Sequence, residues 1–211
     1  MTTKPQSGSD PKAFLTFVKK GITDFHQTAS LVPSQRFLVN AMVDGAHPER
    51  ARVIVELGPG VGPMTGPLLE RMRPDARLFT IEIDEPLHRE LVRRHRDPRL
   101  TAILGSAEHI EDLLAEHGHE GPVDAVVSSL GMSLIPPAVR ERILQGAAKV
   151  VAPHGVYVQF GYVHTKYFTW TKGEGLQGFD YMKTLRRHFA KVTRKPVPAN
   201  IPPAWVYQAR T

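Results

Sequence analysis

The chain has 211 residues, no cysteine and a formal net charge of +6. It is 41% hydrophobic and 23% charged, as in an ordinary packed domain, and a chain this long buries roughly 70% of its unfolded surface. Disulfides and cysteine-ligated metal sites are excluded, the histidines show no ligand spacing, and no 18 uninterrupted apolar residues occur, so we expect a cytoplasmic protein without a metal or a membrane span.

Residues 12–29 show helical periodicity, because their apolar side chains recur mostly at steps of three and four. These side chains fall in one sector about 160° wide. They are Phe14, Leu15, Phe17, Val18, Ile22, Phe25 and Ala29. Phenylalanines beside Lys19 and Lys20 are typical of a helix that lies on an anionic membrane surface. Packing of the same apolar face against the rest of the protein is the alternative.

The remaining elements predict an α/β fold. Pro33 ends the first helix, and Ser34 is placed to cap a second helix at 35–42. Beyond Pro48, short β-rich runs alternate with helical patterns, which predicts βαβ units and a mostly parallel sheet. The predicted strands are 52–57, 77–83, 100–104, 123–128 and 155–161, and the predicted helices are 64–72, 86–95, 110–117 and 137–151. Strands at 190–195 and 204–209 are expected to form a closing antiparallel hairpin.

A glycine-rich turn follows the first predicted strand. Its sequence, Glu56-Leu57-Gly58-Pro59-Gly60-Val61-Gly62, precedes a helix, and such a turn lets a ligand approach the backbone. A dinucleotide fingerprint requires a glycine at position 63, where Pro63 stands and removes an N–H group. The turn therefore argues against NAD, and the acid at position 56 suits a ligand that carries an ammonium group.

Polar residues follow the next three strands. Glu82 ends the second strand, where a carboxylate can accept both hydroxyls of a ribose. The third strand is followed by Gly105-Ser106-Ala107-Glu108, and the fourth ends in Ser128-Ser129-Leu130. All these points meet at the carboxyl edge of one parallel sheet, which is where open α/β folds bind ligands. Together they predict a nucleoside ligand.

The basic residues gather in the C-terminal third. Residues 140–211 contain 12 of the 27 Lys and Arg residues and 3 of the 21 Asp and Glu residues, so residues 1–139 hold the other 15 and 18. This asymmetry suits nucleic acid, an anionic membrane or a phosphorylated small molecule, and a solvated basic face is the alternative.

With these motifs, the sequence resembles the Rossmann-like S-adenosylmethionine-dependent methyltransferases. Within them it is most similar to the bacterial phospholipid N-methyltransferases, relatives of the rRNA adenine dimethyltransferases, from about Phe14 to Arg210. The resemblance is carried by Pro33-Ser34-Gln35-Arg36-Phe37-Leu38, 56–62, Ile81-Glu82-Ile83-Asp84, 126–136 and Gln159-Phe160-Gly161-Tyr162. It implies a seven-stranded, mostly parallel sheet with a C-terminal antiparallel hairpin. We expect residues 1–47 to be a membrane-associating helix and cap, and residues 48–211 to be the cofactor-binding domain.

The resemblance also implies roles for individual residues toward S-adenosylmethionine. Glu56 is expected to face the methionine amino group, Gly58, Gly60 and Gly62 to admit the cofactor, Glu82 to hold the ribose and Ile83 to line the adenine. Ser34 and Gln35 match the place where relatives touch the methionine end. The family usually has an acid at position 106, where this chain has Ser106 beside Ala107. Either Glu108 replaces that acid or the adenine is held more weakly.

For the acceptor amine, Ser128 and Tyr162 stand at the mouth of the predicted sheet. Tyr162, Tyr167 and Trp170 are candidates for cation–π contact with methylated ammonium products. Arg186 and Arg187, with Lys166, are candidates to hold a lipid phosphate. Packing roles for the aromatic residues and solvated roles for the basic residues are the alternatives. No residue stands out as a general base.

Three classes of function compete. The first is a lipid N-methyltransferase that converts phosphatidylethanolamine and its methylated intermediates toward phosphatidylcholine, with ornithine lipid as an alternative acceptor. The second is an rRNA adenine N6-methyltransferase. It is disfavoured because the fourth strand ends in Ser-Ser-Leu-Gly rather than Asn-x-Pro-aromatic, and because no C-terminal helical domain follows. The third is a non-catalytic lipid-binding module. We therefore expect an anionic membrane and a phospholipid as partners, and no nucleic acid.

Overall fold

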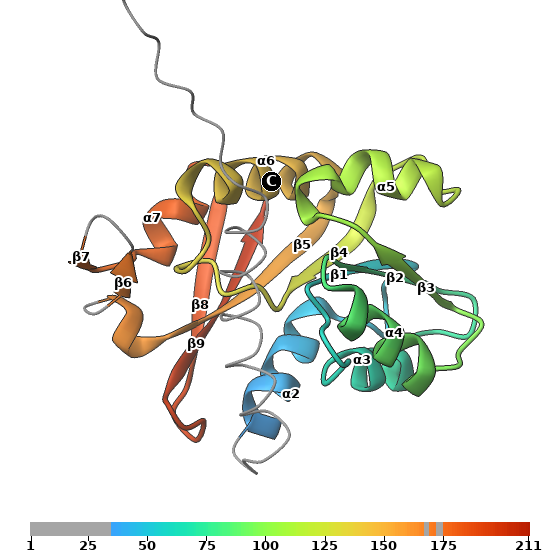
Figure 1. The fold of residues 1–211 in the computed structure, drawn as a ribbon, viewed down its shortest axis with the longest axis horizontal. Helices are drawn as coiled ribbons and strands as arrows, with labels where there is room; N and C mark the ends of the chain where they lie inside the picture. Colours follow the sequence, from blue (N-terminus) through green and yellow to red (C-terminus); the bar gives the residue numbers. More distant parts are fainter. Residues whose placement is uncertain (1–34, 167–168, 172–174) are drawn as a thin grey trace, which may run out of the picture.

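The computed structural model describes residues 35–166, 169–171 and 175–211, which form a three-layered α/β domain (Figure 1). A central sheet has α2, α3 and α4 on one side and α5, α6 and α7 on the other. The helices are α2 (Gln35–Ala46), α3 (Thr65–Arg71), α4 (Glu85–Arg94), α5 (Ile110–Glu116), α6 (Pro137–Val150) and α7 (Tyr181–Leu185), with 3-10 turns η1 (Ala107–His109) and η2 (Val163–Lys166). No helix in this part of the chain is long and apolar enough to cross a membrane.

The main sheet has seven strands in the order β3-β2-β1-β4-β5-β9-β8. Strands β1 to β5 run parallel, and β9 and β8 close the sheet as an antiparallel hairpin. The strands are β1 (Val53–Leu57), β2 (Arg77–Glu82), β3 (Leu100–Leu104), β4 (Val123–Ser128), β5 (Val151–Tyr162), β8 (Lys191–Val197) and β9 (Ala204–Arg210). The predicted Rossmann-like methyltransferase sheet is confirmed.

The strand ends are brought into line by the sheet register. Leu57 lies opposite both Ile81 and Ser128. Backbone hydrogen bonds continue past the strand ends, because the Gly58 N–H donates to the Ile81 carbonyl at 2.9 Å and the Ser129 N–H donates to the Leu57 carbonyl at 2.9 Å. The residues after β1, β2 and β4 therefore share one edge of the sheet.

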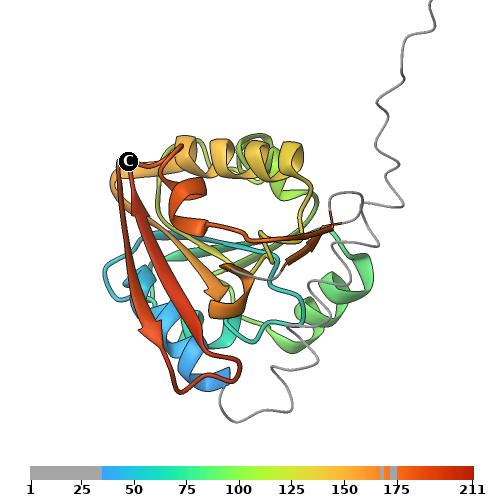
Figure 2. The ribbon, with the colours of Figure 1, turned by 90° about the vertical axis from the view of Figure 1, so that its left-hand side faces the viewer.

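Helix α2 is longer than the sequence pattern predicts. The predicted helix ends at residue 42, whereas α2 continues through Asp44 and Gly45 to Ala46. Its apolar face is fully packed against the sheet, with Leu38 and Met42 both 0% exposed, and the helix lies along β5 and β9 (Figure 2). A Cβ atom at Gly45 would lie 3.1 Å from Cγ1 of Val158, so the glycine permits close contact with β5. Helix α2 is thus part of the sheet domain, and a separate N-terminal unit remains an expectation for the residues before it.

Three further features differ from the predicted elements. Strand β5 begins at Val151 rather than 155, and the register between β4 and β5 shifts between Val123 and Ala125. A two-stranded sheet, β6 (Thr169–Thr171) with β7 (Gly175–Gln177), and the short helix α7 were not predicted. These elements are only three to five residues long, too short for a periodic hydrophobic pattern to identify them.

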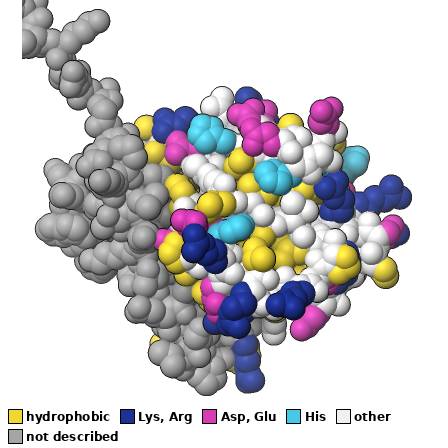
Figure 3. Space-filling view, turned by 45° about the vertical axis from the view of Figure 1, so that its right-hand side comes forward, with side chains coloured by type: hydrophobic (Ala, Val, Ile, Leu, Met, Phe, Trp, Pro, Cys, Tyr) yellow, Lys and Arg dark blue, Asp and Glu magenta, His cyan; other side chains and the backbone are white. Residues whose placement is uncertain are grey.

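Charged side chains of both signs are interspersed on the face shown in Figure 3, around a central hydrophobic area. Helix α4 carries exposed ion pairs at helical spacing, such as Arg93 with Glu90 at 2.7 Å. Exposed pairs of this kind contribute little to stability. The described charges on this face are therefore of both signs.

Candidate active site

The glycine-rich turn after β1 has the backbone conformation that its sequence predicts. Gly58, Gly60 and Gly62 all have positive φ angles, of 65°, 56° and 87°. Side chains other than glycine rarely adopt this region. A Cβ atom at Gly58 would also lie 2.5 Å from Cδ2 of Leu130, the residue that follows β4 by two positions. Glycine at position 58 therefore lets the Leu130 side chain pack directly on the backbone of the turn.

Glu82 at the end of β2 braces this turn. Its side chain is 1% exposed, and its two carboxylate oxygens accept hydrogen bonds from the Gly60 N–H and the Asp84 N–H, both at 2.9 Å. Burial raises the pKa of Glu82, and these backbone donors oppose that rise. Each oxygen keeps a second lone pair, so the carboxylate can still accept from two ligand hydroxyls.

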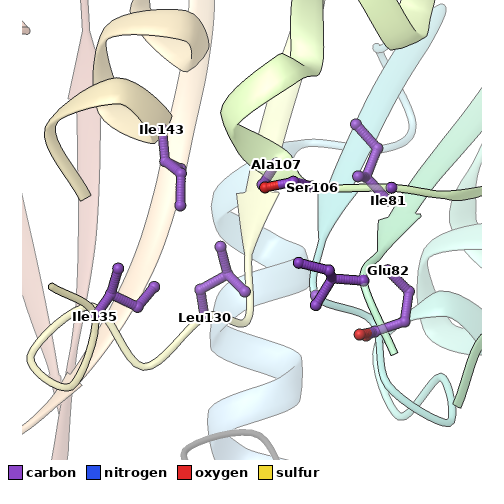
Figure 4. A pocket seen from close by; sticks show the side chains of 10 residues that line it. Ile81, Glu82, Ser106, Ala107, Leu130, Ile135 and Ile143 are labelled. Atoms are coloured by element: carbon purple, nitrogen blue, oxygen red, sulfur yellow. The ribbon is translucent and has the colours of Figure 1, made fainter. Parts of the chain in front are cut away.

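A pocket opens beside Glu82, between the ends of β1, β2 and β3 on one side and the start of α6 on the other (Figure 4). It is lined by Gly58, Ile81, Glu82, Ile83, Gly105, Ser106, Ala107, Leu130, Ile135 and Ile143. Of the predicted cofactor residues, the structure brings Gly58, Glu82, Ile83, Ser106 and Ala107 together in this lining. Leu130, which was expected at this edge, also lines the pocket, whereas the apolar contributions of Ile135 and Ile143 were not predicted.

Glu108 lies outside the pocket lining that contains Ser106. Its carboxylate accepts from the Arg142 guanidinium at 2.6 Å, and it also accepts from the Ser106 hydroxyl at 3.3 Å. Ser106 in turn accepts from the Glu108 N–H and begins the turn η1. The residues after β3 that line the pocket, Gly105, Ser106 and Ala107, are therefore all uncharged.

Glu56 lies at the end of β1 and is fully buried. Its Oε2 accepts from the Thr65 hydroxyl at 2.7 Å, and its Oε1 has no hydrogen-bond partner within the described residues. Burial raises the pKa of Glu56 to about 7, against the effect of Thr65, and the Glu82 charge adds to the rise. A buried carboxylate with a free oxygen is suited to a cationic ligand group.

The buried position of Glu56 predicts that the ligand-free protein loses stability as pH rises. The unfolded chain ionises Glu56 near pH 4.5, whereas the folded protein keeps it protonated up to about pH 7. Between these values the unfolded state binds fewer protons, so we expect the free energy of unfolding to fall by up to about 3 kcal/mol. Urea denaturation from pH 4.5 to 7.5 measures this. The decline should be smaller in Glu56→Gln, and an identical decline in that variant would contradict the assignment.

The two serines after β4 differ in their surroundings. Ser128 is 0% exposed, and its hydroxyl contacts the Leu130 N–H and the Tyr157 hydroxyl, so it is held inside the sheet. The Ser129 hydroxyl is also buried but has no hydrogen-bond partner in the described part of the chain. Ser129 is therefore a better candidate than Ser128 for contact with a ligand, which the sequence alone did not distinguish.

A buried polar network fixes the segment after β4. The Tyr157 hydroxyl donates to Gln159 Oε1 at 2.8 Å, and Gln159 Nε2 donates to the Leu130 carbonyl at 2.9 Å. Because Leu130 lines the pocket and faces Gly58, Gln159 acts as a support for the pocket wall.

Tyr162 ends β5 beside the first turn of α2. Burial raises the pKa of Tyr162, and the Gln35 side chain near its hydroxyl opposes that rise. Gln35 is 2% exposed, and neither of its amide atoms makes a hydrogen bond of good geometry to another described residue. The ring of Tyr162 stacks on His164, with centroids 5.6 Å apart. The structure thus brings two predicted site residues, Gln35 and Tyr162, together at the carboxyl edge.

Several predicted residues lie outside the described residues. They are Phe14, Phe17, Lys19, Lys20, Ser34 and Tyr167, and the side chain of Trp170 in β6 belongs with them. Arg186 and Arg187, at the C-terminal end of α7, are exposed. Arg186 lines a second cavity and Arg187 does not, so the structure separates these two neighbours.

The fold, the glycine-rich turn and the acid at the end of β2 define an S-adenosylmethionine-dependent methyltransferase. A family model described as a methyltransferase domain matches residues 54–155. An ornithine lipid N-methyltransferase from Singulisphaera acidiphila is 30% identical over 200 residues, which cover 94% of this chain and 96% of that relative. The chain belongs to the S-adenosylmethionine-dependent methyltransferase family that includes this relative.

Other similarities are shorter or more distant. Ribosomal RNA small subunit methyltransferase A from Aromatoleum aromaticum is 39% identical over 70 residues, which cover 33% of this chain and 25% of that protein. The N-methyltransferase NodS from Bradyrhizobium japonicum has a TM-score of 0.67 at 14% identity and covers 85% of this chain and 97% of its own. A 1,6-didemethyltoxoflavin-N1-methyltransferase from Burkholderia thailandensis, solved with S-adenosylhomocysteine, has a TM-score of 0.66 at 17% identity and covers 100% and 93%. These two structures establish the fold alone.

The residues present fit S-adenosylmethionine. Gly58 and Glu82 both line the pocket, each Glu82 oxygen has a lone pair left for a ribose hydroxyl, and Glu56 has an unpartnered buried oxygen for an ammonium group. Ile83, Ala107 and Ile143 offer the apolar walls that an adenine ring needs.

Proposed function

We propose that the protein is an N-methyltransferase that acts on a lipid amine at a membrane surface, with ornithine lipid as the acceptor. The observation that carries this proposal is the match to the Singulisphaera enzyme, which runs through nearly the whole of both chains. The matches to rRNA methyltransferases cover only about a quarter of those proteins. Phosphatidylethanolamine is the second candidate, supported by the same motifs, because it also presents a primary amine near an anionic group.

The chemistry requires little from the protein beyond binding and alignment. S-adenosylmethionine, when bound, supplies a methyl group activated by a sulfonium centre. Glu82 and Glu56 hold the cofactor at its ribose and its amino group, while Gly58 lets it lie against the backbone. Tyr162, at the end of β5, and Ser129, directly after β4, would orient the acceptor amine and exclude water from it.

Incubation with labelled S-adenosylmethionine and separate acceptors tests the proposal. We expect label in vesicles that contain ornithine lipid, less in vesicles of phosphatidylethanolamine, and none in rRNA. Label in rRNA alone would contradict a lipid acceptor, and preference for phosphatidylethanolamine would replace ornithine lipid as the substrate.

Tyr162→Phe tests the hydroxyl at the end of β5. If this hydroxyl orients the amine, turnover should fall by roughly ten- to a hundred-fold while cofactor affinity is unchanged. Steady-state kinetics and calorimetry with S-adenosylhomocysteine measure the two quantities. A fully active Tyr162→Phe enzyme would leave Tyr162 with a packing role.

The residues before α2 carry the prediction for membrane binding. If the apolar stripe lies in the interface, Phe14→Ser/Phe17→Ser should release the protein from phosphatidylglycerol vesicles without changing its cofactor affinity. Binding by the unaltered protein should also weaken with added salt, because surface attraction is screened beyond roughly 10 Å at 0.1 M. Vesicle sedimentation measures both effects. If the variant instead loses vesicle binding, cofactor affinity and thermal stability together, the stripe is part of the protein core.

A further inference from the structure

A second cavity lies on the α7 side of the sheet, at the carboxyl end of β5. Its volume is about 270 Å³, near the roughly 300 Å³ at which small-molecule pockets begin. Its walls come from η2, α7 and the β8–β9 hairpin. Tyr162, the last residue of β5, also lines it. The lining includes Arg186, Arg194, Asp180 and an aromatic group formed by Tyr181, Trp205 and Tyr207.

Arg194 is placed toward this cavity by the strand pattern of β8. Val192 and Arg194 share one face of the strand, and Val192 packs in the core on the α6 and α7 side. The Arg194 guanidinium lies over the Trp205 ring, 4.2 Å from its centroid, and contacts the Tyr207 hydroxyl. Lys195, the next residue, faces the opposite side and does not line the cavity.

The cavity has more positive than negative charge available. No carboxylate in the described ranges forms an ion pair with Arg186 or Arg194. The Asp180 carboxylate is used as the N-cap of α7, where it accepts from the Lys183 N–H at 3.0 Å. Each guanidinium has five donors in a planar fork that matches a carboxylate or a phosphate, so an anion is the ligand that this cavity suits.

A side-chain contact connects this cavity to the segment that lines the cofactor pocket. The Tyr181 hydroxyl contacts Ser133, and Ser133 belongs to the segment from Leu130 to Ile135 whose ends line the cofactor pocket. A Cβ atom at Gly161 would lie 2.6 Å from the Tyr181 ring, so this glycine lets Tyr181 pack directly on β5. An anion held beyond Tyr181 would leave the rest of its molecule at the end of β5, beside Tyr162.

We infer that this cavity binds the anionic group of the acceptor headgroup, and this inference rests on the proposed function. Ornithine carries a carboxylate, and phosphatidylethanolamine carries a phosphate, each a few bonds from the amine that is methylated. Arg186 and Arg194 hold that anion, and the aromatic walls contact the linking methylene groups. The amine then extends past Tyr162 toward the cofactor.

Binding of soluble headgroup probes tests this inference without requiring turnover. The probes are N-hexanoyl-ornithine, dihexanoyl phosphatidylethanolamine and inorganic phosphate, titrated by calorimetry into protein saturated with S-adenosylhomocysteine. We expect the protein to bind at least one headgroup probe more tightly than phosphate. Arg186→Gln and Arg194→Gln should each weaken that binding by roughly ten-fold or more. The matched control Lys195→Gln removes the same charge from the other face of β8 and should bind as the unaltered protein does.

The inference is overturned if the double variant Arg186→Gln/Arg194→Gln binds the probes normally, or if neither headgroup probe binds. It is also overturned if phosphate alone binds as tightly, which would indicate a site for the free anion. S-adenosylhomocysteine affinity reports whether each variant is folded and should stay within about two-fold. Methyl transfer that is insensitive to both arginines would reject this subsite and leave the proposed function standing. Arginine-dependent probe binding without methyl transfer would reject the proposed function and leave the anion site standing.

Discussion

Replacement of Glu82 by Ala is expected to weaken S-adenosylmethionine binding by on the order of 2 to 3 kcal/mol, which is roughly a hundred-fold in affinity. In the proposed mode of cofactor binding, the variant loses the acceptors for two ribose hydroxyls. It also frees the Gly60 and Asp84 N–H groups that the carboxylate now holds at 2.9 Å, so the glycine-rich turn loses its brace. Calorimetric titration with S-adenosylmethionine and S-adenosylhomocysteine measures the loss.

A suitable control for this variant is Glu85→Ala. Glu85 is an exposed acid in the first turn of α4 and pairs with Arg89, so its removal changes the net charge by the same amount without touching the pocket. Cofactor affinity in the control should match that of the unaltered protein. Unchanged affinity in Glu82→Ala would mean that the ribose is held elsewhere.

The second large effect is a pH dependence of cofactor affinity that comes from Glu56. Its pKa of about 7 leaves the side chain mostly protonated at pH 6, where it cannot pair with the ammonium group of the cofactor. Binding must then displace a proton, so we expect affinity to rise by on the order of ten-fold between pH 6 and pH 7.5. Calorimetry at pH 6 in two buffers with different ionisation enthalpies should detect the released proton.

Glu56→Gln keeps the shape of the side chain and removes its titration. This variant should bind the cofactor more weakly at pH 7.5, and its affinity should be nearly flat over the same range. The buried Thr65 hydroxyl, which donates to Glu56, can donate to the amide oxygen of glutamine in the same way. The variant should therefore fold. A Glu56→Gln protein with the same rise in affinity would transfer the titration to another group.

Much of the cofactor site was predictable because it depends on local rules. The ends of parallel strands meet at one edge of a sheet, so Gly58, Glu82 and Ser106 were placed together by the strand pattern alone. The positive φ angles of the glycines follow from their residue type. The roles of Ser128 and Ser129 could not be separated in this way, because their sequence signals are equivalent. Only the structure shows that the Ser128 hydroxyl has hydrogen-bond partners and that the Ser129 hydroxyl has none among the described residues.

Other features depend on tertiary packing that no local pattern carries. Glu108 was a plausible adenine ligand by position, yet Arg142 on α6 draws it away from the pocket. The apolar wall from Ile135 and Ile143 comes from a loop and a helix whose docking only the fold determines. Helix α2 extends beyond its predicted C-terminal end because its last turn is buried against β5 and β9. Asp180 caps the short helix α7, and this capping signal was not used in the sequence analysis.

The measurement that tests the central claim most directly is mass analysis of the lipid product. The purified protein is incubated with ornithine lipid and S-adenosylmethionine that carries a deuterated methyl group, and the product is fragmented. We expect one or more labelled methyl groups on the side-chain amine of the ornithine headgroup. Parallel reactions contain phosphatidylethanolamine or rRNA in place of ornithine lipid. Unlabelled ornithine lipid, together with label in either of these parallel reactions, would contradict ornithine lipid as the acceptor.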